Sequence, residues 1–147
     1  MPIEHIRVSQ QAKEQLVRIK RWTGLKHWNE ICRWAFCASL AEKTIPAPSK
    51  IAADSSVEMS WRVFGGQHHE LYLALLKQRC LSDALGTSDE VLTTQFRLHL
   101  HRGLGYIAAD RQIRIAVCQV EHALGHNEFD REAGVTRIEV FKQPGGH

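Results

Sequence analysis

Polar and apolar residues follow two different periods in the first forty positions of the chain. Residues 5–9 alternate one by one, which predicts a short strand. Residues 10–22 repeat their apolar positions at helical spacing, and after a turn at Gly24 a second helical pattern runs over about 26–42. A strand, a helix, a glycine-containing turn and a second helix occur in this order in ribbon-helix-helix DNA-binding units.

The second of these predicted helices is apolar over more than half of its circumference. Ile31, Ala35 and Ala38 follow one line along it, and Cys32 and Phe36 lie beside that line. A helix of this kind lies either at the centre of its own core or against another subunit. The pattern is the main indication of an oligomer in the sequence.

The rest of the chain predicts mostly helix. Two prolines make residues 44–56 a loop, and alternation over 57–64 predicts a second strand that ends at the Gly65-Gly66 pair. Helical spacing then returns in three segments, residues 68–80, 89–102 (closed by Gly103 and Gly105) and 108–124. Residues 135–141 could form a terminal strand, before a frayed end.

These elements predict a mainly α fold. We expect a compact helical domain with a ribbon-helix-helix-like N-terminal strand-helix-helix and one or two short strands. A chain of 147 residues is long enough for one compact core but short for two. No segment approaches the roughly 20 apolar residues of a membrane span, and no signal peptide is evident, so we expect a cytoplasmic protein that does not contact a membrane.

The cysteines and the tryptophans fit buried positions better than chemical roles. None of the four cysteines belongs to a C-x-x-C pair, and each lies within an apolar helical pattern, so we expect buried free thiols rather than disulfides or metal ligands. The four tryptophans could stack on exposed DNA bases, but core or subunit-interface positions are favoured.

Positive charge is concentrated at the amino-terminal end. Residues 1–43 hold eight Lys or Arg against four acids, a net +4, which leaves −1 for the remainder of a chain whose total is +3. Such a segment suits a phosphate backbone, because neutralised phosphates release condensed counterions. The alternative is that these are solvated helix charges, some of them paired with Glu14 or Glu30. The candidate DNA-binding residues are Arg7, Lys13, Arg18, Lys20, Arg21, Lys26 and Arg33.

Several short segments, taken in order, carry a family resemblance. They are Ile6-Arg7-Val8-Ser9, residues 16–20 with Thr23-Gly24-Leu25, Trp28-Asn29, Arg33-Trp34-Ala35-Phe36, Ser39-Leu40, Phe64-Gly65-Gly66 and residues 99–106. In this order and spacing they resemble the DndE family of bacterial DNA sulfur-modification proteins. The resemblance covers about residues 3–106, and its specificity comes from order and spacing rather than from a catalytic fingerprint.

The resemblance implies a fold, an assembly and a role. It implies a small, mostly helical homotetramer that serves as a non-enzymatic accessory subunit of the machinery that replaces a non-bridging phosphate oxygen of DNA with sulfur. Members of the family are described as preferring nicked duplex DNA, and sulfur mobilisation and iron–sulfur chemistry belong to other subunits. The expected partners are therefore nicked duplex DNA and those subunits, and no cofactor is expected.

The same resemblance divides the chain into two parts. Residues 1–106 are expected to form a DndE-like helical DNA-binding domain. Residues 107–147 are a C-terminal extension that the family pattern does not explain. We expect this extension to pack on the same domain and to end in a frayed terminus.

A sequence-specific regulator of the ribbon-helix-helix type is the alternative function. Its strand would pair with a partner's strand and lay His5 and Arg7 in the major groove of DNA. The strand offers only these two polar positions for reading bases, whereas Ile6 and Val8 fit a core. A grip on the DNA backbone needs no base contacts and is therefore favoured.

Metal and nucleophile chemistry are weakly supported. His122 and His126 are spaced to share a helix face and could bind zinc, but Ala123 stands where a metalloprotease helix has glutamate, and Gly125 predicts a helix end between them. Cys80 or Cys118 could pair with a histidine as a nucleophile, but no local motif places them together, and no phosphate-binding loop motif is present. We expect no metal site and no enzymatic activity.

Overall fold

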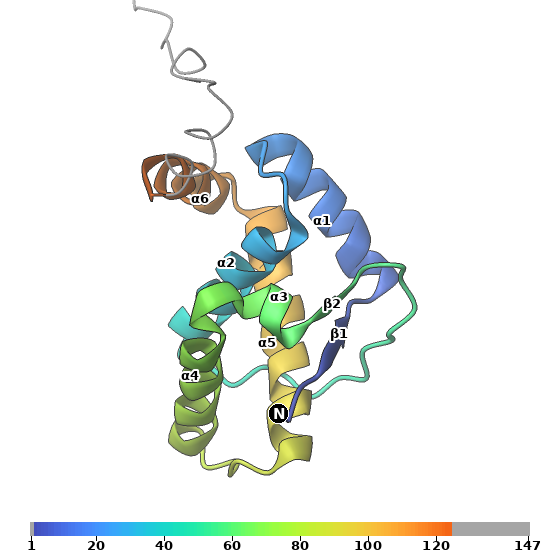
Figure 1. The fold of residues 1–147 in the computed structure, drawn as a ribbon, viewed down its shortest axis with the longest axis vertical. Coiled ribbons are helices and arrows are strands. Elements are labelled where there is room, and N and C mark those ends of the chain that lie inside the picture. The colour runs from blue at the N-terminus through green and yellow to red at the C-terminus, as the bar shows by residue number, and fades with distance from the viewer. Residues whose placement is uncertain (1, 125–147) are drawn as a thin grey trace, which may run out of the picture.

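A computed structural model describes residues 2–124 and shows a mainly helical protein with a small antiparallel sheet (Figure 1). The predicted fold class is therefore confirmed. The predicted strand at 135–141 and the frayed end lie outside the described residues. The elements, in chain order, are β1 (His5–Arg7), α1 (Gln10–Thr23), α2 (Trp28–Ala41), β2 (Glu58–Ser60), α3 (Trp61–Gly65), the 3-10 turn η1 (Gly66–His68), α4 (His69–Ser82), α5 (Asp89–Ala109) and α6 (Arg111–Leu124).

The sheet is a two-stranded ribbon made within one chain. β1 and β2 are antiparallel, with Ile6 opposite Met59 and Arg7 opposite Glu58. Ile6 and Met59 face the core and are buried, whereas Arg7 and Glu58 are exposed. The alternative function, a ribbon-helix-helix regulator, predicts that a partner's strand pairs with β1. In the structure β1 pairs with β2 of the same chain.

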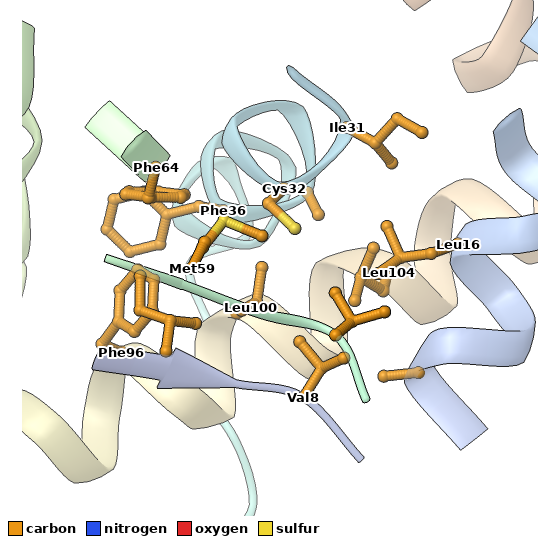
Figure 2. Close-up of a cluster of buried hydrophobic side chains, with 14 of the residues drawn as sticks. Val8, Leu16, Ile31, Cys32, Phe36, Met59, Phe64, Phe96, Leu100 and Leu104 are labelled. Carbon is orange, nitrogen blue, oxygen red and sulfur yellow. The ribbon is translucent and has the colours of Figure 1, made fainter. Parts of the chain in front are cut away.

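Helix α2 lies at the centre of the core and packs against the long helix α5. Figure 2 shows Phe36 of α2, Phe64 of α3 and Phe96 of α5 pointing toward one another. The ring centroids of Phe36 and Phe96 are 5.3 Å apart, and those of Phe64 and Phe96 are 5.0 Å apart. The wide apolar surface of α2, which indicated a subunit interface in the sequence, is thus largely used by the chain's own core.

The predicted strand over residues 57–64 is wrong in its second half, because a helix begins inside it. Ser60 caps α3, since its Oγ accepts a hydrogen bond of 3.2 Å from the Val63 amide. Trp61 and Phe64, three residues apart, both enter the core, while Val63 is 52% exposed. Burial therefore follows a helical period here, although the sequence continues to alternate.

The predicted stop of a helix at Gly103 and Gly105 is also wrong, because α5 continues through both glycines to Ala109. Gly103 is where α5 meets the backbone of α2. A Cβ added at Gly103 would lie 1.7 Å from the Ala35 carbonyl oxygen, whereas one added at Gly105 would meet nothing within 4 Å. Gly103 is thus a close-packing residue within the helix.

Helix α4 was predicted correctly as a helix. Its spacing places Leu71, Leu75 and Tyr72 on one face, and of these three only Tyr72 packs against the core. In the structure Leu71 is 56% and Leu75 39% exposed, and Leu76 and Cys80 are buried instead. The exposed side of α4 carries a further apolar residue, Leu81, which is 58% exposed.

The last described helix, α6, packs against α1 and α5. It begins after Asp110, whose carboxylate accepts hydrogen bonds from the amides of Gln112 (2.8 Å) and Ile113 (3.3 Å). Val117 of α6 is buried, and the Cys118 thiol donates to the Thr23 carbonyl of α1 at 3.4 Å. The described part of the extension therefore covers the carboxyl-terminal end of α1.

All four cysteines are free thiols, as predicted. Cys32 and Cys80 are buried, but Cys37 and Cys118 are only half-buried. Burial raises the pKa of the Cys32 thiol to about 12, which keeps it protonated and unreactive. Between residues 2 and 124, no helix is long and apolar enough to cross a membrane.

Candidate nucleic-acid interface

Helix α1 carries four of the seven candidate cations, so its construction positions the candidate site. Ser9 caps it, because its Oγ accepts a hydrogen bond of 3.1 Å from the Ala12 amide. Gly24 ends it in the left-handed region, at a φ of 72°. Leu16 and Ile19 bury the inner face completely. The polar face is thereby turned toward solvent along the whole helix.

The amino-terminal end of α1 is fastened to α5 and to the loop before β2. The Ser9 amide donates to His101 Nε2 at 3.1 Å, and the Gln10 amide donates to the Asp54 carboxylate at 2.9 Å. The other ring nitrogen of His101 donates to the Arg97 carbonyl at 2.8 Å, so the imidazole is neutral. Burial is the main cause that lowers the pKa of His101, consistent with this neutral state.

Three of the candidate cations are free. Arg18 and Arg21 on α1, and Lys26 in the turn that follows, are exposed, and none of them forms a hydrogen bond or an ion pair within residues 2–124. Two further lysines of α1 are half-buried. Lys13 donates to Ser56 Oγ at 2.7 Å, and Lys20 lies 4.4 Å from the centre of the Trp28 ring. None of these five cations is neutralised by a described carboxylate.

The remaining two candidates are occupied by contacts within the fold. Arg7 forms an ion pair of 2.7 Å with Glu58 across the β1–β2 ribbon. Arg33 donates to the Phe64 carbonyl at 2.8 Å and so ties α2 to the end of α3. Both side chains hold parts of the fold together, so Arg7 and Arg33 are the least favoured of the seven candidates for contact with DNA.

The length of α1 suits contact with several phosphates. Lys13 and Arg21 are eight residues apart, which corresponds to about 12 Å along a helix axis. Phosphates of one DNA strand follow each other at about 3.4 Å along the duplex axis, so this stretch matches three or four of them. At 3.6 residues per turn, Lys13 and Lys20 share one side of the solvent face and Arg18 and Arg21 lie on the other, so the row is a band of cations across that face. A rigid band of this length suits contact with the DNA backbone and needs no base contacts.

Two cations that the sequence analysis did not single out lie beside α1. Arg111 and Arg114 come from α6, and the Arg114 guanidinium lies 4.1 Å from the centre of the Trp22 ring. Trp22 is half exposed, unlike the buried Trp61. Trp61 thus has the predicted core position, whereas Trp22 lies outside the core of this chain, and its alternative position in a subunit interface stays a prediction. The Arg-x-x-Arg spacing of α6 was visible, but its nearness to α1 is a tertiary feature.

Some other basic residues serve the fold. Arg102 donates to the Ser39 carbonyl and to the Thr44 carbonyl, both at 2.8 Å. Arg79 donates to the Leu40 carbonyl at 2.9 Å and pairs with Asp83 at 2.8 Å. Both guanidinium groups satisfy carbonyl groups at the end of α2, where a helix has orphan acceptors.

The histidines do not assemble into a metal cluster within residues 2–124, where no group of three or more His, Cys, Asp or Glu could hold an ion. His126 of the predicted zinc pair lies outside the described residues, and the side chain of His122 is not described. His99 is fully buried and its Nδ1 lies 2.8 Å from Ser39 Oγ. Burial lowers the pKa of His99 to about 4, and the nearby Arg102 charge adds to that shift.

The fold and this surface define a small, mainly helical protein that presents a row of cations on its first helix, above a core built from α2 and α5. The sequence model of the DndE family, described as DNA sulphur modification protein DndE, matches residues 5–115. The chain belongs to the DndE family. The match extends nine residues beyond the boundary expected at residue 106 and includes the start of α6.

Two solved structures have a similar fold. The crystal structure of DndE from Escherichia coli B7A, involved in DNA phosphorothioation modification, is 19% identical, with a TM-score of 0.59 over 70% of this chain and 94% of that one. A DndE mutant with two glycine-to-lysine substitutions, involved in DNA phosphorothioation, is 18% identical, with a TM-score of 0.57 over 73% of this chain and 98% of that one. A search of curated proteins finds no match.

Proposed function

We propose that this chain is a non-enzymatic accessory subunit of the machinery that places sulfur in the DNA backbone. In this role it binds the phosphates of duplex DNA, with a preference for nicked duplexes. It works in the cytoplasm beside the other subunits of the modification complex, as a homotetramer. Membership of the DndE family supports the place in this system.

The observation that carries the proposal is the row of cations on α1 that no described carboxylate neutralises. A cation already paired within the fold releases few counterions when it meets a phosphate, whereas an unpaired one contributes fully to salt-dependent binding. The preference for a nick follows from the rigid platform. A duplex that bends freely at a break can bring the backbone on both sides onto one surface at a lower deformation cost.

The test is a measurement of DNA binding by fluorescence anisotropy, with nicked and intact duplexes of one sequence at several salt concentrations. The variant reverses the three free cations, Arg18, Arg21 and Lys26, to glutamate. We expect it to weaken binding to all sequences alike, and to lower the salt slope by about 1 for each phosphate that the protein no longer neutralises. These exposed side chains form no described hydrogen bond or ion pair, so we expect the fold to be kept, and thermal melting of the variant checks this.

The matched control reverses the exposed cations Lys43, Arg62 and Lys77, which lie outside α1, and so changes the net charge by the same amount. We expect this variant to retain most of the affinity and most of the salt slope. Equally weakened binding in both triple variants, or binding that ignores salt, would contradict the α1 surface. Equal affinity for nicked and intact duplexes would contradict the nick preference.

A further inference from the structure

A pocket opens between the carboxyl-terminal end of α1 and one side of α6. Its volume is about 400 Å³, which is within the range of about 300–1,000 Å³ of small-molecule sites. We call it the aromatic–arginine pocket, and it is lined by Trp22, Arg111, Arg114, Ile115, Cys118 and Gln119. Cys118 and Gln119 lie beyond the stretch that matches the family model.

The walls of this pocket combine a flat aromatic surface with positive charge. Trp22 exposes 50% of its surface, which is unusual for so large an aromatic side chain and is typical of recognition surfaces. Two guanidinium groups and no carboxylate occur among the lining residues. The Gln119 amide adds both a hydrogen-bond donor and an acceptor.

The two arginines of the pocket differ in their freedom. Arg114 Nη1 donates to the carbonyls of Ile107 and Ala108, at 3.0 and 2.8 Å, so its guanidinium is held at the end of α5. It lies over one face of the Trp22 indole, and the exposed half of Trp22 remains open to a base. Arg111 is exposed and forms no hydrogen bond or ion pair within the described chain. One cation is therefore fixed as part of the wall, and the other is available to a ligand.

The ligand that fits such walls is planar, aromatic and anionic. A nucleobase can stack on an indole or on a guanidinium plane, and its phosphate can pair with a free arginine. Arg18 lies four residues before Trp22 on α1, a rise of about 6 Å along the axis. DNA backbone held by the cations of α1 therefore runs next to the pocket.

We propose that the aromatic–arginine pocket receives one unpaired nucleotide at a break in DNA, with its base against Trp22 and its phosphate on Arg111. This inference rests on the proposed function, because it requires α1 to hold the backbone beside the break. A terminal base at a break is the easiest base to remove from the stack. The pocket thus adds a sequence-tolerant stacking contact to the grip on phosphates.

The experiment compares three nicked duplexes by fluorescence anisotropy at one salt concentration. The first has a plain nick, the second carries one unpaired adenosine at the nick, and the third carries an abasic residue in that place; the unpaired residue is tested on the 5′ and the 3′ side. Stacking of one base is worth about 1–3 kcal/mol, so we expect the adenosine duplex to bind roughly 5- to 150-fold more tightly than the abasic duplex. This ratio is the measured quantity.

The variants separate stacking from charge. We expect Trp22→Ala to bring the ratio close to 1 and Trp22→Phe to retain most of it. Arg111→Ala removes a phosphate contact, so it should weaken the adenosine and abasic duplexes by the same factor. Ile45→Ala removes an equally exposed apolar side chain from the loop beyond α2 and should change neither affinity. Thermal melting of each variant checks that the fold is kept.

The possible failures are distinguishable. The pocket proposal alone is contradicted if the adenosine and abasic duplexes bind equally with the unpaired residue on either side of the nick. It is also contradicted if Trp22→Ala leaves the ratio unchanged. Failure to bind any of the three duplexes overturns the proposed function and this inference with it. Replacing the unpaired adenosine by 2-aminopurine gives an independent readout, because stacking on the indole is expected to quench its fluorescence in the unaltered protein but not in Trp22→Ala.

Discussion

Gly103 and Gly105 are both glycines of α5, but one is tightly packed and the other is not. Gly103 lies against the Ala35 backbone of α2, and Gly105 has open space where a Cβ would be. Glycine normally weakens a helix interior by about 0.5–1 kcal/mol relative to alanine. At Gly103 that cost is offset by the close approach of two helices, and at Gly105 nothing in the described residues offsets it.

A pair of alanine substitutions tests this difference. We expect Gly103→Ala to lower the free energy of unfolding by at least the roughly 1–3 kcal/mol that is usual for overpacking, because the obstructing atom belongs to a backbone. Gly105→Ala should instead raise it by up to about 1 kcal/mol. Urea unfolding followed by far-UV circular dichroism measures both values. A Gly103→Ala protein as stable as the unaltered one would show that α2 and α5 do not pack as described.

His99 is a second residue whose environment decides its behaviour. The Arg102 Nε group donates to Ser39 Oγ at 2.8 Å, so the Ser39 hydroxyl hydrogen is free to donate to His99 Nδ1. This bond requires a neutral imidazole, and the pKa of His99 is lowered from 6.5 to about 4, first by burial. Between these two values the unfolded chain binds a proton at this residue and the folded chain does not.

Acidification should therefore destabilise the fold through His99. Its contribution is fully present above pH 6.5 and is lost as the pH falls toward 4, by about 3 kcal/mol in total. The variant His99→Gln keeps a hydrogen-bonding group but cannot titrate, so its unfolding free energy should fall less between pH 7.5 and 5 than that of the unaltered protein. Urea midpoints over this range measure the difference. His27→Gln, which removes an exposed histidine, is the matched control variant.

At the level of whole elements, periodicity predicted helices well and their ends less well. The predicted helices over 10–22 and about 26–42 correspond to α1 and α2, which end within two residues of the expected positions. The failure at Ser60 has a local cause. A serine cap and apolar residues one helical turn apart, Trp61 and Phe64, were present in residues 60–64. They overlapped with an alternating pattern that is equally compatible with a strand. Short segments of this kind are decided by tertiary packing.

The exposed face of α4 shows a different limit. Helical spacing predicts which apolar residues share a face of a helix, but it does not predict what packs against that face. Leu71, Leu75 and Leu81 are all exposed, and the α4 sequence has apolar residues around most of its surface. Among the described helices, this is where we expect the contacts between subunits of the proposed homotetramer.

A double substitution tests this expectation. We expect Leu71→Lys with Leu75→Lys to reduce the mass of the assembly in light scattering, because two charges would have to be desolvated at a subunit contact. The melting temperature of the dissociated chain should change little, since both side chains are exposed in the monomer. Ile45→Lys, at another exposed apolar residue, should leave the mass unchanged. An unaltered mass in the double variant would place the contacts elsewhere.

At the scale of the whole molecule, the candidate surface could be predicted only in outline. The cluster of charge in the first forty residues was visible, and five of the seven candidates remain unneutralised. The sequence did not show which of these basic side chains form ion pairs or hydrogen bonds within the fold. Arg7 meets Glu58, which is fifty-one residues away in the sequence, and Arg33 meets a carbonyl thirty-one residues away. Charge counting cannot anticipate such long-range contacts.

The aromatic–arginine pocket lay beyond the sequence analysis for the same reason. Trp22 and Arg114 are separated by most of the chain, and no local pattern links them. The segment that contains Arg111 and Arg114 also belongs to a remainder whose net charge is negative, so the two arginines did not stand out. Only the packing of α6 against α1 brings the indole and the guanidinium together.

The fastening of α1 at both ends has a thermodynamic consequence. One end is held by the His101 and Asp54 hydrogen bonds and the other by the thiol of Cys118. A helix ordered in advance loses little backbone entropy when a polyanion docks on it, unlike a basic tail that must fold as it binds. Little of the favourable free energy of counterion release is then offset by the cost of ordering the protein. For the same reason, we expect a small heat capacity change on association.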